Sequence, residues 1–271
     1  MKQSDSSFLE KYFQRIGYTG LATPTLECLR ILHRLHEESI PFENLNVLLG
    51  HVIRIDSDSV FEKLVEQRRG GYCFEQNTLF SDVLRKIGFR VTPYIARVRW
   101  QAPVGTTTPL THMILGVETE KGPYLADVGF GGPGLIEPIS LQSEATQHLD
   151  FEPRRVVDTD GGHLHQMMVG EEWRDVYLFE AKGVAPVDLE IGNWYSCTHP
   201  KARFRNSLLV AQISSNGRIM ISDTELITRD WNGHSVRTAI EGKAQLKELL
   251  KTRFDLELDH FDQLPFPTPL A

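Results

Sequence analysis

Cys73 lies two residues after the pair Gly70-Gly71 and precedes an apolar segment with helical spacing. Glycines let the backbone turn tightly and approach a ligand closely. The spacing predicts a helix that begins near Cys73 and stops at Gly88. A helix N-terminus favours an anion, so a cysteine there is favoured as the thiolate, which is the nucleophilic form. A lone cysteine is more often a small buried apolar residue, and it is the residues around Cys73 that favour a nucleophile.

A thiolate nucleophile needs a base, and the base needs an acceptor that orients it. His112 opens the apolar run 112–117, and Asp127 lies near the end of the run 124–128. Both runs are typical of strands, and neighbouring strands would present the two side chains side by side. Taken singly, each is most simply a hydrogen-bonded core histidine or a turn acceptor before Gly129. With Cys73 they form a coherent catalytic triad.

The elements that must position these residues follow a simple order. The first third reads as helices, one capped by Thr23 with Pro24 at its first position and one opened by a capping box of Ser59 and Glu62. Short strands follow at 91–100, 112–117, 124–128, 166–169 and 176–179. A hairpin at 208–213 and 218–222 turns at Asn216-Gly217, and a helix covers 246–254. We therefore expect an α+β protein with domains at 1–90, 91–195 and 196–271.

Composition narrows the class of function. The chain has 271 residues and a formal net charge of -7 from 29 basic and 36 acidic residues, which indicates no nucleic-acid or membrane partner. No apolar run approaches the roughly 20 residues of a membrane span, and the start of the sequence is polar. Three cysteines are few, and an odd number cannot all pair, so the sequence does not indicate a disulfide framework. We expect a cytoplasmic protein in which Cys28 and Cys197 are structural.

Four ordered motifs resemble those of the arylamine N-acetyltransferases, over about residues 12–199. One contains the nucleophile, one lies upstream of it, and two contain the histidine and the aspartate. Gln76 stands where a leucine is expected in many members. The motifs are Pro41-Phe42-Glu43-Asn44-Leu45, Arg69-Gly70-Gly71-Tyr72-Cys73-Phe74-Glu75, Thr111-His112-Met113 and Ala126-Asp127-Val128-Gly129-Phe130-Gly131.

The resemblance implies an N-terminal helical bundle, an antiparallel β-barrel-like domain and a C-terminal α/β lid, with a papain-like (transglutaminase-like) catalytic layout. It implies transfer of acetyl from acetyl-CoA to arylamines, arylhydroxylamines or arylhydrazines, by a ping-pong mechanism through acetyl-Cys73. A role in xenobiotic metabolism and a monomer or homodimer are part of the same expectation. Glu43 and Arg69 would pair beneath the nucleophile loop, whereas the residues alone fit two exposed charges equally well.

Other residues are candidates for the substrate pocket. Because the glycine-rich segment 129–134 directly follows Asp127, it must border the site, and Gly129, Phe130 and Gly131 are predicted to contact the substrate. Phe204 resembles a further pocket position of the family. The predicted CoA contacts are Trp100 and Thr108, on the polar stretch before His112, and Gly132. Phe130 and Phe204 fit a core position equally well. The glycine cluster is a weak phosphate-binding signal. His163 and His165 alone are too few ligands to indicate a metal site.

Two other functions remain compatible with the residues. A cysteine hydrolase or a transglutaminase-like enzyme would use the same triad with water or a peptide amine. A non-enzymatic binder of aromatic ligands would leave Cys73 inert. Dependence of acetyl-CoA turnover on an added arylamine separates the first rival, and iodoacetamide labelling at pH 6 separates the second.

Overall fold

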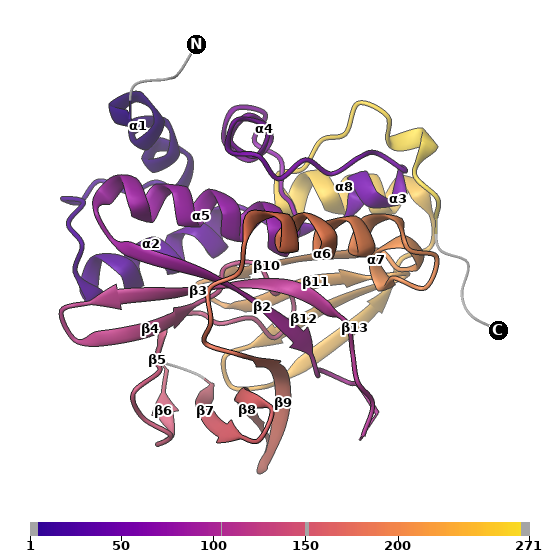
Figure 1. Ribbon diagram of the computed structural model, residues 1–271. Helices are drawn as coiled ribbons and strands as arrows, with labels where there is room; N and C mark the ends of the chain where they lie inside the picture. The colour runs from indigo at the N-terminus through magenta and orange to yellow at the C-terminus, as the bar shows by residue number, and fades with distance from the viewer. Residues whose placement is uncertain (1–4, 104, 150–151, 267–271) are drawn as a thin grey trace.

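The computed structural model describes residues 5–103, 105–149 and 152–266, and its helices gather mainly in the first third (Figure 1). Within these residues no helix is long and apolar enough to cross a bilayer. The helices are α1 (Asp5–Ile16), α2 (Leu26–Ser39), α3 (Leu45–Leu48), α4 (Ser57–Phe61), the π-helix η1 (Glu62–Glu66), α5 (Cys73–Ile87), α6 (Pro186–Thr198), α7 (Arg203–Asn206), α8 (Lys243–Phe254) and the 3₁₀ helix η2 (Phe261–Gln263).

Two antiparallel sheets make up the rest of the fold. The larger follows the order β5-β4-β3-β2-β9-β8-β7-β6, and contacts between β5 and β7 curl it into a nearly closed barrel. Its strands are β2 (Arg90–Val98), β3 (Leu110–Thr119), β4 (Gly122–Ala126), β5 (Ile139–Ser140), β6 (Gln147–His148), β7 (Pro153–Thr159), β8 (Gly162–Val169) and β9 (Glu172–Phe179). The smaller sheet contains β1 (Phe42–Glu43), β10 (Leu209–Ser214), β11 (Gly217–Ser222), β12 (Glu225–Asp230) and β13 (Ser235–Ala239).

The predicted α+β arrangement is confirmed, and its parts meet around β3. Helices α5 and α6 lie along the same side of the large sheet, and both pack against β3 (Figure 1). Strand β1 pairs with β10, so a segment from the first third completes the sheet of the last third. Helix α6 spans residue 195, where one domain boundary is predicted. The division into three domains stays a prediction.

Two predicted helix starts are wrong. The N–H of Thr25 donates to the carbonyl of Thr23 and closes a tight turn around Pro24, so Thr25 rather than Thr23 caps α2. The Ser59 capping box does not form either. Asp56 Oδ1 accepts the Ser59 N–H at 3.1 Å, and because a carboxylate caps well, α4 begins at Ser57.

Other elements have no counterpart in the sequence prediction. Helix α6 was not predicted, because it has apolar residues on two sides. One side packs on β3, and the other exposes Val187, Ile191 and Trp194. Such a helix lacks the single apolar stripe that marks an amphipathic helix. Helix α1 and strands β1, β5, β6, β7, β12 and β13 are also absent from the prediction. Residues 267–271, the end of the predicted proline-rich tail, lie outside the described residues.

Candidate active site

Cys73 is the first residue of α5, and the chain around it fixes that start. Glu75 Oε2 accepts the Tyr72 N–H at 3.1 Å, which caps the helix just before the cysteine. The first N–H groups of a helix have no acceptor within the helix itself. Cys73 is 2% exposed, and its Sγ lies 3.6 Å from the carbonyl oxygen of Thr111. The predicted position of the thiol at a helix N-terminus is therefore observed.

His112 on β3 and Asp127 just after β4 are both buried and in direct contact. His112 Nε2 lies 2.7 Å from Asp127 Oδ2, so Nδ1 is the ring nitrogen free to hydrogen-bond the Cys73 thiol. Burial alone would lower the pKa of His112, but the charge and hydrogen bond of Asp127, together with Cys73, raise that pKa to about 10. Burial likewise would raise the pKa of Asp127, and His112 outweighs it and lowers that pKa. The structure therefore brings the three predicted triad residues together, with a positively charged imidazole at pH 7.

Asn77 connects the three parts of this site. It lies one turn beyond Cys73 on α5, and its Nδ2 donates to Asp127 Oδ1 at 2.9 Å and to the Met113 carbonyl at 2.8 Å. Its Oδ1 accepts the Val128 N–H at 3.1 Å. One amide thus ties the nucleophile helix to the histidine strand and to the aspartate loop. The sequence analysis gave Asn77 no role, although residues four apart on a helix share one face.

A buried histidine supports Asp127 from behind. His33 Nε2 accepts the backbone N–H of Asp127 at 3.2 Å, and His33 Nδ1 contacts the Ile136 carbonyl at 3.2 Å. Burial lowers the pKa of His33 to about 4, so the ring is neutral at pH 7. A neutral ring with Nε2 as acceptor satisfies both contacts. The sequence gives no signal for this role, because His33 lies 94 residues from Asp127.

Two glycines are needed for close packing at the site. A β-carbon at Gly129 would lie 2.7 Å from Cys73 Cα and 2.8 Å from Asn77 Nδ2. A β-carbon at Gly70 would run into the Pro41 carbonyl and lie 2.7 Å from Glu43 Cγ. Gly129 therefore lets the aspartate loop approach helix α5, and Gly70 lets the nucleophile loop approach Pro41 and Glu43.

Charged side chains cluster beneath the nucleophile loop. Arg69 Nη2 lies 2.7 Å from Glu43 Oε1, and both side chains are largely buried, so the reading as two exposed charges is wrong. Lys63, on the π-helix η1, joins them at 2.6 Å from Glu75 Oε1 and 3.7 Å from Glu43. Burial would raise the pKa of Glu43, but Lys63 and Arg69 outweigh it and lower that pKa. The sequence analysis did not assign Lys63 or Glu75 to this cluster.

Gln76 replaces the expected leucine with a hydrogen-bonding group. Its Nε2 donates to the carbonyls of Pro41 at 2.9 Å and Gly71 at 3.3 Å. Its Oε1 lies 2.7 Å from His36 Nε2, and His36 Nδ1 lies 2.8 Å from the Tyr12 hydroxyl. A chain of buried hydrogen bonds therefore links α1 and α2 to the nucleophile loop.

A cavity of about 420 Å³ opens beside the triad. Its lining includes Cys73, His112 and the predicted contacts Trp100, Thr108, Gly129, Phe130 and Phe204. The His112 and Phe130 rings meet edge to face, with their centroids 5.0 Å apart, and the centroids of the Phe204 and Phe42 rings are 5.7 Å apart.

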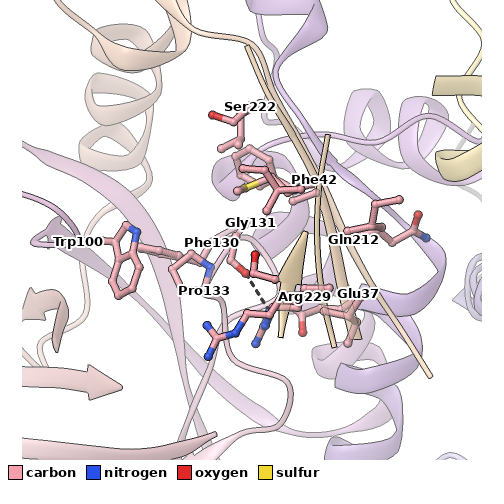
Figure 2. A pocket seen from close by; sticks show the side chains of 18 of the residues that line it. Glu37, Phe42, Trp100, Phe130, Gly131, Pro133, Gln212, Ser222 and Arg229 are labelled. Atoms are coloured by element: carbon pink, nitrogen blue, oxygen red, sulfur yellow. Dashed lines mark hydrogen bonds between the residues drawn. The ribbon is translucent and has the colours of Figure 1, made fainter. Parts of the chain in front are cut away.

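A second cavity, of about 340 Å³, shares part of this wall (Figure 2). The residues common to both are Phe42, Trp100, Gln101, Phe130, Arg203 and Leu209, and Gly131 and Gly132 line the second cavity. The two cavities are therefore neighbours along one wall. Phe42 lies on it, although the sequence analysis gave this residue no pocket role.

The remaining candidate residues form no hydrogen bond to the triad among the residues described. All three cysteines are free thiols, with Cys28 beside the Tyr18 hydroxyl and Cys197 against the Trp194 carbonyl. His163 bonds Asp158, whereas the ring nitrogens of His165 have no hydrogen-bond partner among the residues the structure describes. Across those same residues no group of three or more His, Cys, Asp or Glu is arranged to hold a metal ion.

A cysteine at a helix start that faces a His–Asp pair on a curled antiparallel sheet is the papain-like layout of cysteine-nucleophile enzymes. Comparison with known proteins narrows this class. Residues 25–263 match the N-acetyltransferase family model. Arylamine N-acetyltransferase of Mycobacterium tuberculosis is 38% identical, covering 92% of this chain and 89% of that protein.

Two further relatives agree. The arylamine N-acetyltransferase / N-hydroxyarylamine O-acetyltransferase of Salmonella typhimurium is 37% identical, covering 93% of this chain and 89% of that protein. The structure of Mycobacterium marinum arylamine N-acetyltransferase in complex with CoA superposes with a TM-score of 0.91 at 35% identity, covering 94% of this chain and 96% of that one. This chain belongs to the arylamine N-acetyltransferase family.

Proposed function

We propose that this protein transfers acetyl from acetyl-CoA to the nitrogen of arylamines or arylhydrazines, or to arylhydroxylamines, with Cys73 as nucleophile, His112 as acid and base, and Asp127 as its orienting partner. One observation carries the assignment of residues: Cys73 and His112 line a cavity of about 420 Å³, and the Asp127 carboxylate lies behind His112, 2.7 Å from its Nε2. Family membership, and the relatives described with CoA and with N-hydroxyarylamine activity, support the donor and the acceptors.

In the first half-reaction the Cys73 thiolate attacks the thioester carbonyl of acetyl-CoA. The developing oxyanion is held by backbone N–H groups at the start of α5, including that of Cys73. When the tetrahedral intermediate collapses, its bond to the CoA sulfur breaks and His112 gives that sulfur a proton. A cationic His112, with a pKa of about 10, is suited to this step because it holds the proton that CoA needs.

In the second half-reaction the amine attacks acetyl-Cys73. His112, now neutral, removes a proton from the attacking nitrogen, and collapse breaks the bond between the acetyl carbon and Cys73 Sγ. The products are the N-acetylated amine and the Cys73 thiolate beside a protonated His112. Asp127 remains ionised throughout and stabilises the imidazolium.

The walls of the cavity divide between the two substrates. Phe130 and Phe204, with Gly129 and Gly131 beside them, shape the space for the flat acceptor ring. Trp100, Thr108 and Gly132 line the approach of CoA. Arg69 and Glu43 support the nucleophile loop from below. Three free cysteines suit a reducing compartment, so we place this activity in the cytoplasm, acting on foreign aromatic amines as a monomer or homodimer.

The competing reaction is hydrolysis by the same triad. Release of CoA from acetyl-CoA, followed with a thiol reagent at rising arylamine concentration, separates the two. The proposal requires CoA release beyond the first turnover to depend on the amine and one acetylated amine to form per CoA. Equal CoA release with and without amine would instead indicate a hydrolase.

A further inference from the structure

Glu37 on α2 has a buried carboxyl group, one oxygen of which is unpaired among the residues that the structure describes. Its side chain is 9% exposed, and Oε2 has no hydrogen-bond partner anywhere in the described part of the chain. The nearest basic atom is His33 Nδ1, at 4.0 Å, which already contacts the Ile136 carbonyl. A buried polar group that is left unpaired costs free energy, so its presence calls for an explanation.

Other buried carboxylates in this protein are satisfied. Glu43 accepts from Arg69 and from the Leu45 N–H, and Glu75 accepts from Lys63 and the Tyr72 N–H. Glu152 accepts from Arg154 and Arg218. Glu37 is different from all three, although the fold places arginines in the same region.

Arg218 is the basic residue whose charge acts most strongly on Glu37, but its hydrogen bonds go to other groups. Arg218 donates to the carbonyls of Gly132 and Gly134 at 2.9 and 2.8 Å and to Glu152 at 2.7 Å. It holds the glycine-rich loop rather than Glu37. Burial raises the pKa of Glu37 well above its usual value, and Arg218 only partly opposes this. Within the described part of the chain, Glu37 Oε2 is thus left without a hydrogen bond.

Glu37 lines the cavity of about 340 Å³ that shares Phe42, Trp100 and Phe130 with the Cys73 cavity. Figure 2 shows Trp100 at one side of this cavity and Glu37 at the other, with Phe130 and Gly131 between them. The shared wall contains three aromatic residues and Leu209, together with the polar residues Gln101 and Arg203. A molecule with its reacting end at Cys73 and an extended body would pass the aromatic rings of this wall and meet Glu37 as the carboxyl group of the second cavity.

We infer that Glu37 is a specificity-determining residue that accepts a hydrogen bond from an N–H or O–H group remote from the reacting end of the substrate. The inference rests on the proposed function, since it takes the substrate end at Cys73 as given. Two molecules offer this chemistry: an acceptor that carries an amide, amino or hydroxyl substituent, and the pantetheine arm of acetyl-CoA, which carries amide N–H groups.

Two variants test the role of this hydrogen bond. Glu37→Leu removes the acceptor at similar volume, and Glu37→Gln keeps an oxygen that accepts. The rate of Cys73 acetylation by acetyl-CoA and the rate of its discharge by amines are measured separately in single-turnover experiments. The discharging amines are an aniline that carries a carboxamide and a matched aniline that carries a methyl group.

We expect Glu37→Leu to lower kcat/KM by about 3- to 10-fold in the half-reaction that uses the bond, with Glu37→Gln close to wild type. A loss confined to the carboxamide aniline assigns the group to the acceptor. A loss confined to acetylation assigns it to CoA. Equal losses for both anilines, or no loss in either half-reaction, would overturn the inference.

The Tm of Glu37→Leu separates a binding role from a structural one, because loss of a structural group would lower Tm. Because Glu37 is unpaired, Glu37→Leu should raise Tm by a few degrees, as expected where a binding group is retained at a cost in stability. Glu152→Leu, the paired control, should lower Tm. A fall in Tm for Glu37→Leu would contradict the inference. Failure of the wild type to form acetyl-Cys73 would instead contradict the proposed function, whatever the variants do.

Discussion

Asn77 Nδ2 lies 2.9 Å from Asp127 Oδ1, and this bond joins the helix that presents the nucleophile to the residue that orients its base. The two residues are 50 positions apart in the chain. The same amide also bonds the Met113 carbonyl and the Val128 N–H. Alignment of the triad therefore depends on a side chain that takes no part in the chemistry.

Asn77→Ala should reduce both stability and activity. The substitution leaves buried partners unsatisfied, each at a cost of about 1 to 3 kcal/mol, and frees the Asp127 carboxylate to move. We expect a loss of about 2 to 4 kcal/mol in the free energy of unfolding, measured with urea, and a large fall in kcat. Asn206→Ala is the control, because that exposed side chain bonds only the local carbonyls of Pro200 and Ala202 among the residues described. A wild-type kcat in Asn77→Ala would remove Asn77 from the positioning of the triad.

Asp127→Asn should fold but lose about three to four orders of magnitude in kcat, because an amide neither stabilises the imidazolium nor fixes its tautomer. The pKa of His112, raised to about 10 mainly by Asp127 against the effect of burial, should fall steeply in the variant. NMR titration of the His112 ring measures this change directly. A His112 pKa that stays near 10 in Asp127→Asn would show that another group holds the proton.

The same pair makes stability depend on pH. The folded pKa of His112 lies above its usual value of 6.5, so the stabilisation it contributes is complete below about pH 6.5 and is lost as the pH rises through about 10. Urea unfolding of the wild type from pH 6 to pH 10 should therefore show a falling free energy of unfolding, with a weaker slope in Asp127→Asn. Parallel slopes would count against the charged pair.

Gly129→Ala should disrupt the contact between the aspartate loop and the nucleophile helix. The added β-carbon would lie 2.7 Å from Cys73 Cα, where the backbone has to shift, and overpacking of this kind costs about 1 to 3 kcal/mol. Gly132→Ala is the matched control in the same loop, since its β-carbon would meet only Met220 Sδ, at 3.5 Å. Thermal unfolding of the two variants should differ by several degrees. Equal Tm values would show that the loop adapts to a side chain at residue 129.

The residues of the triad were predictable because each lies in a short motif whose local pattern carries meaning. A cysteine after two glycines and before an apolar helix is a local signal, as are His112 and Asp127 on short strands. The supporting residues give no such signal. His33 acts on Asp127 across 94 residues, and Lys63 contacts Glu43 and Glu75 from another helix, so both roles follow only from the fold.

The fold divides in the same way. Helix α5 was predicted well, because its apolar spacing and Gly88 are strong local signals, and it ends at Ile87 with Gly88 in the left-handed conformation. The hairpin β10–β11 was also predicted, although its turn lies one residue earlier than the predicted pair Asn216-Gly217: Ser214 pairs with Gly217, so Ser215 and Asn216 form the turn. Strand β13 was not, because its residues are all exposed and show no alternation of apolar and polar side chains. The pairing of β1 with β10 is a contact between distant segments that no local pattern encodes.

The central claim is that acetyl is carried covalently on Cys73. Intact-protein mass spectrometry after mixing with acetyl-CoA alone should show one added acetyl group, mapped by digestion to the peptide that contains Cys73, and an added arylamine should discharge it. Cys73→Ser should acquire no such adduct, whereas Cys28→Ser and Cys197→Ser should behave like the wild type. If the wild type acetylated arylamine rapidly but never acquired label in single-turnover quench experiments, or acquired it on Cys28 or Cys197, the account would be contradicted.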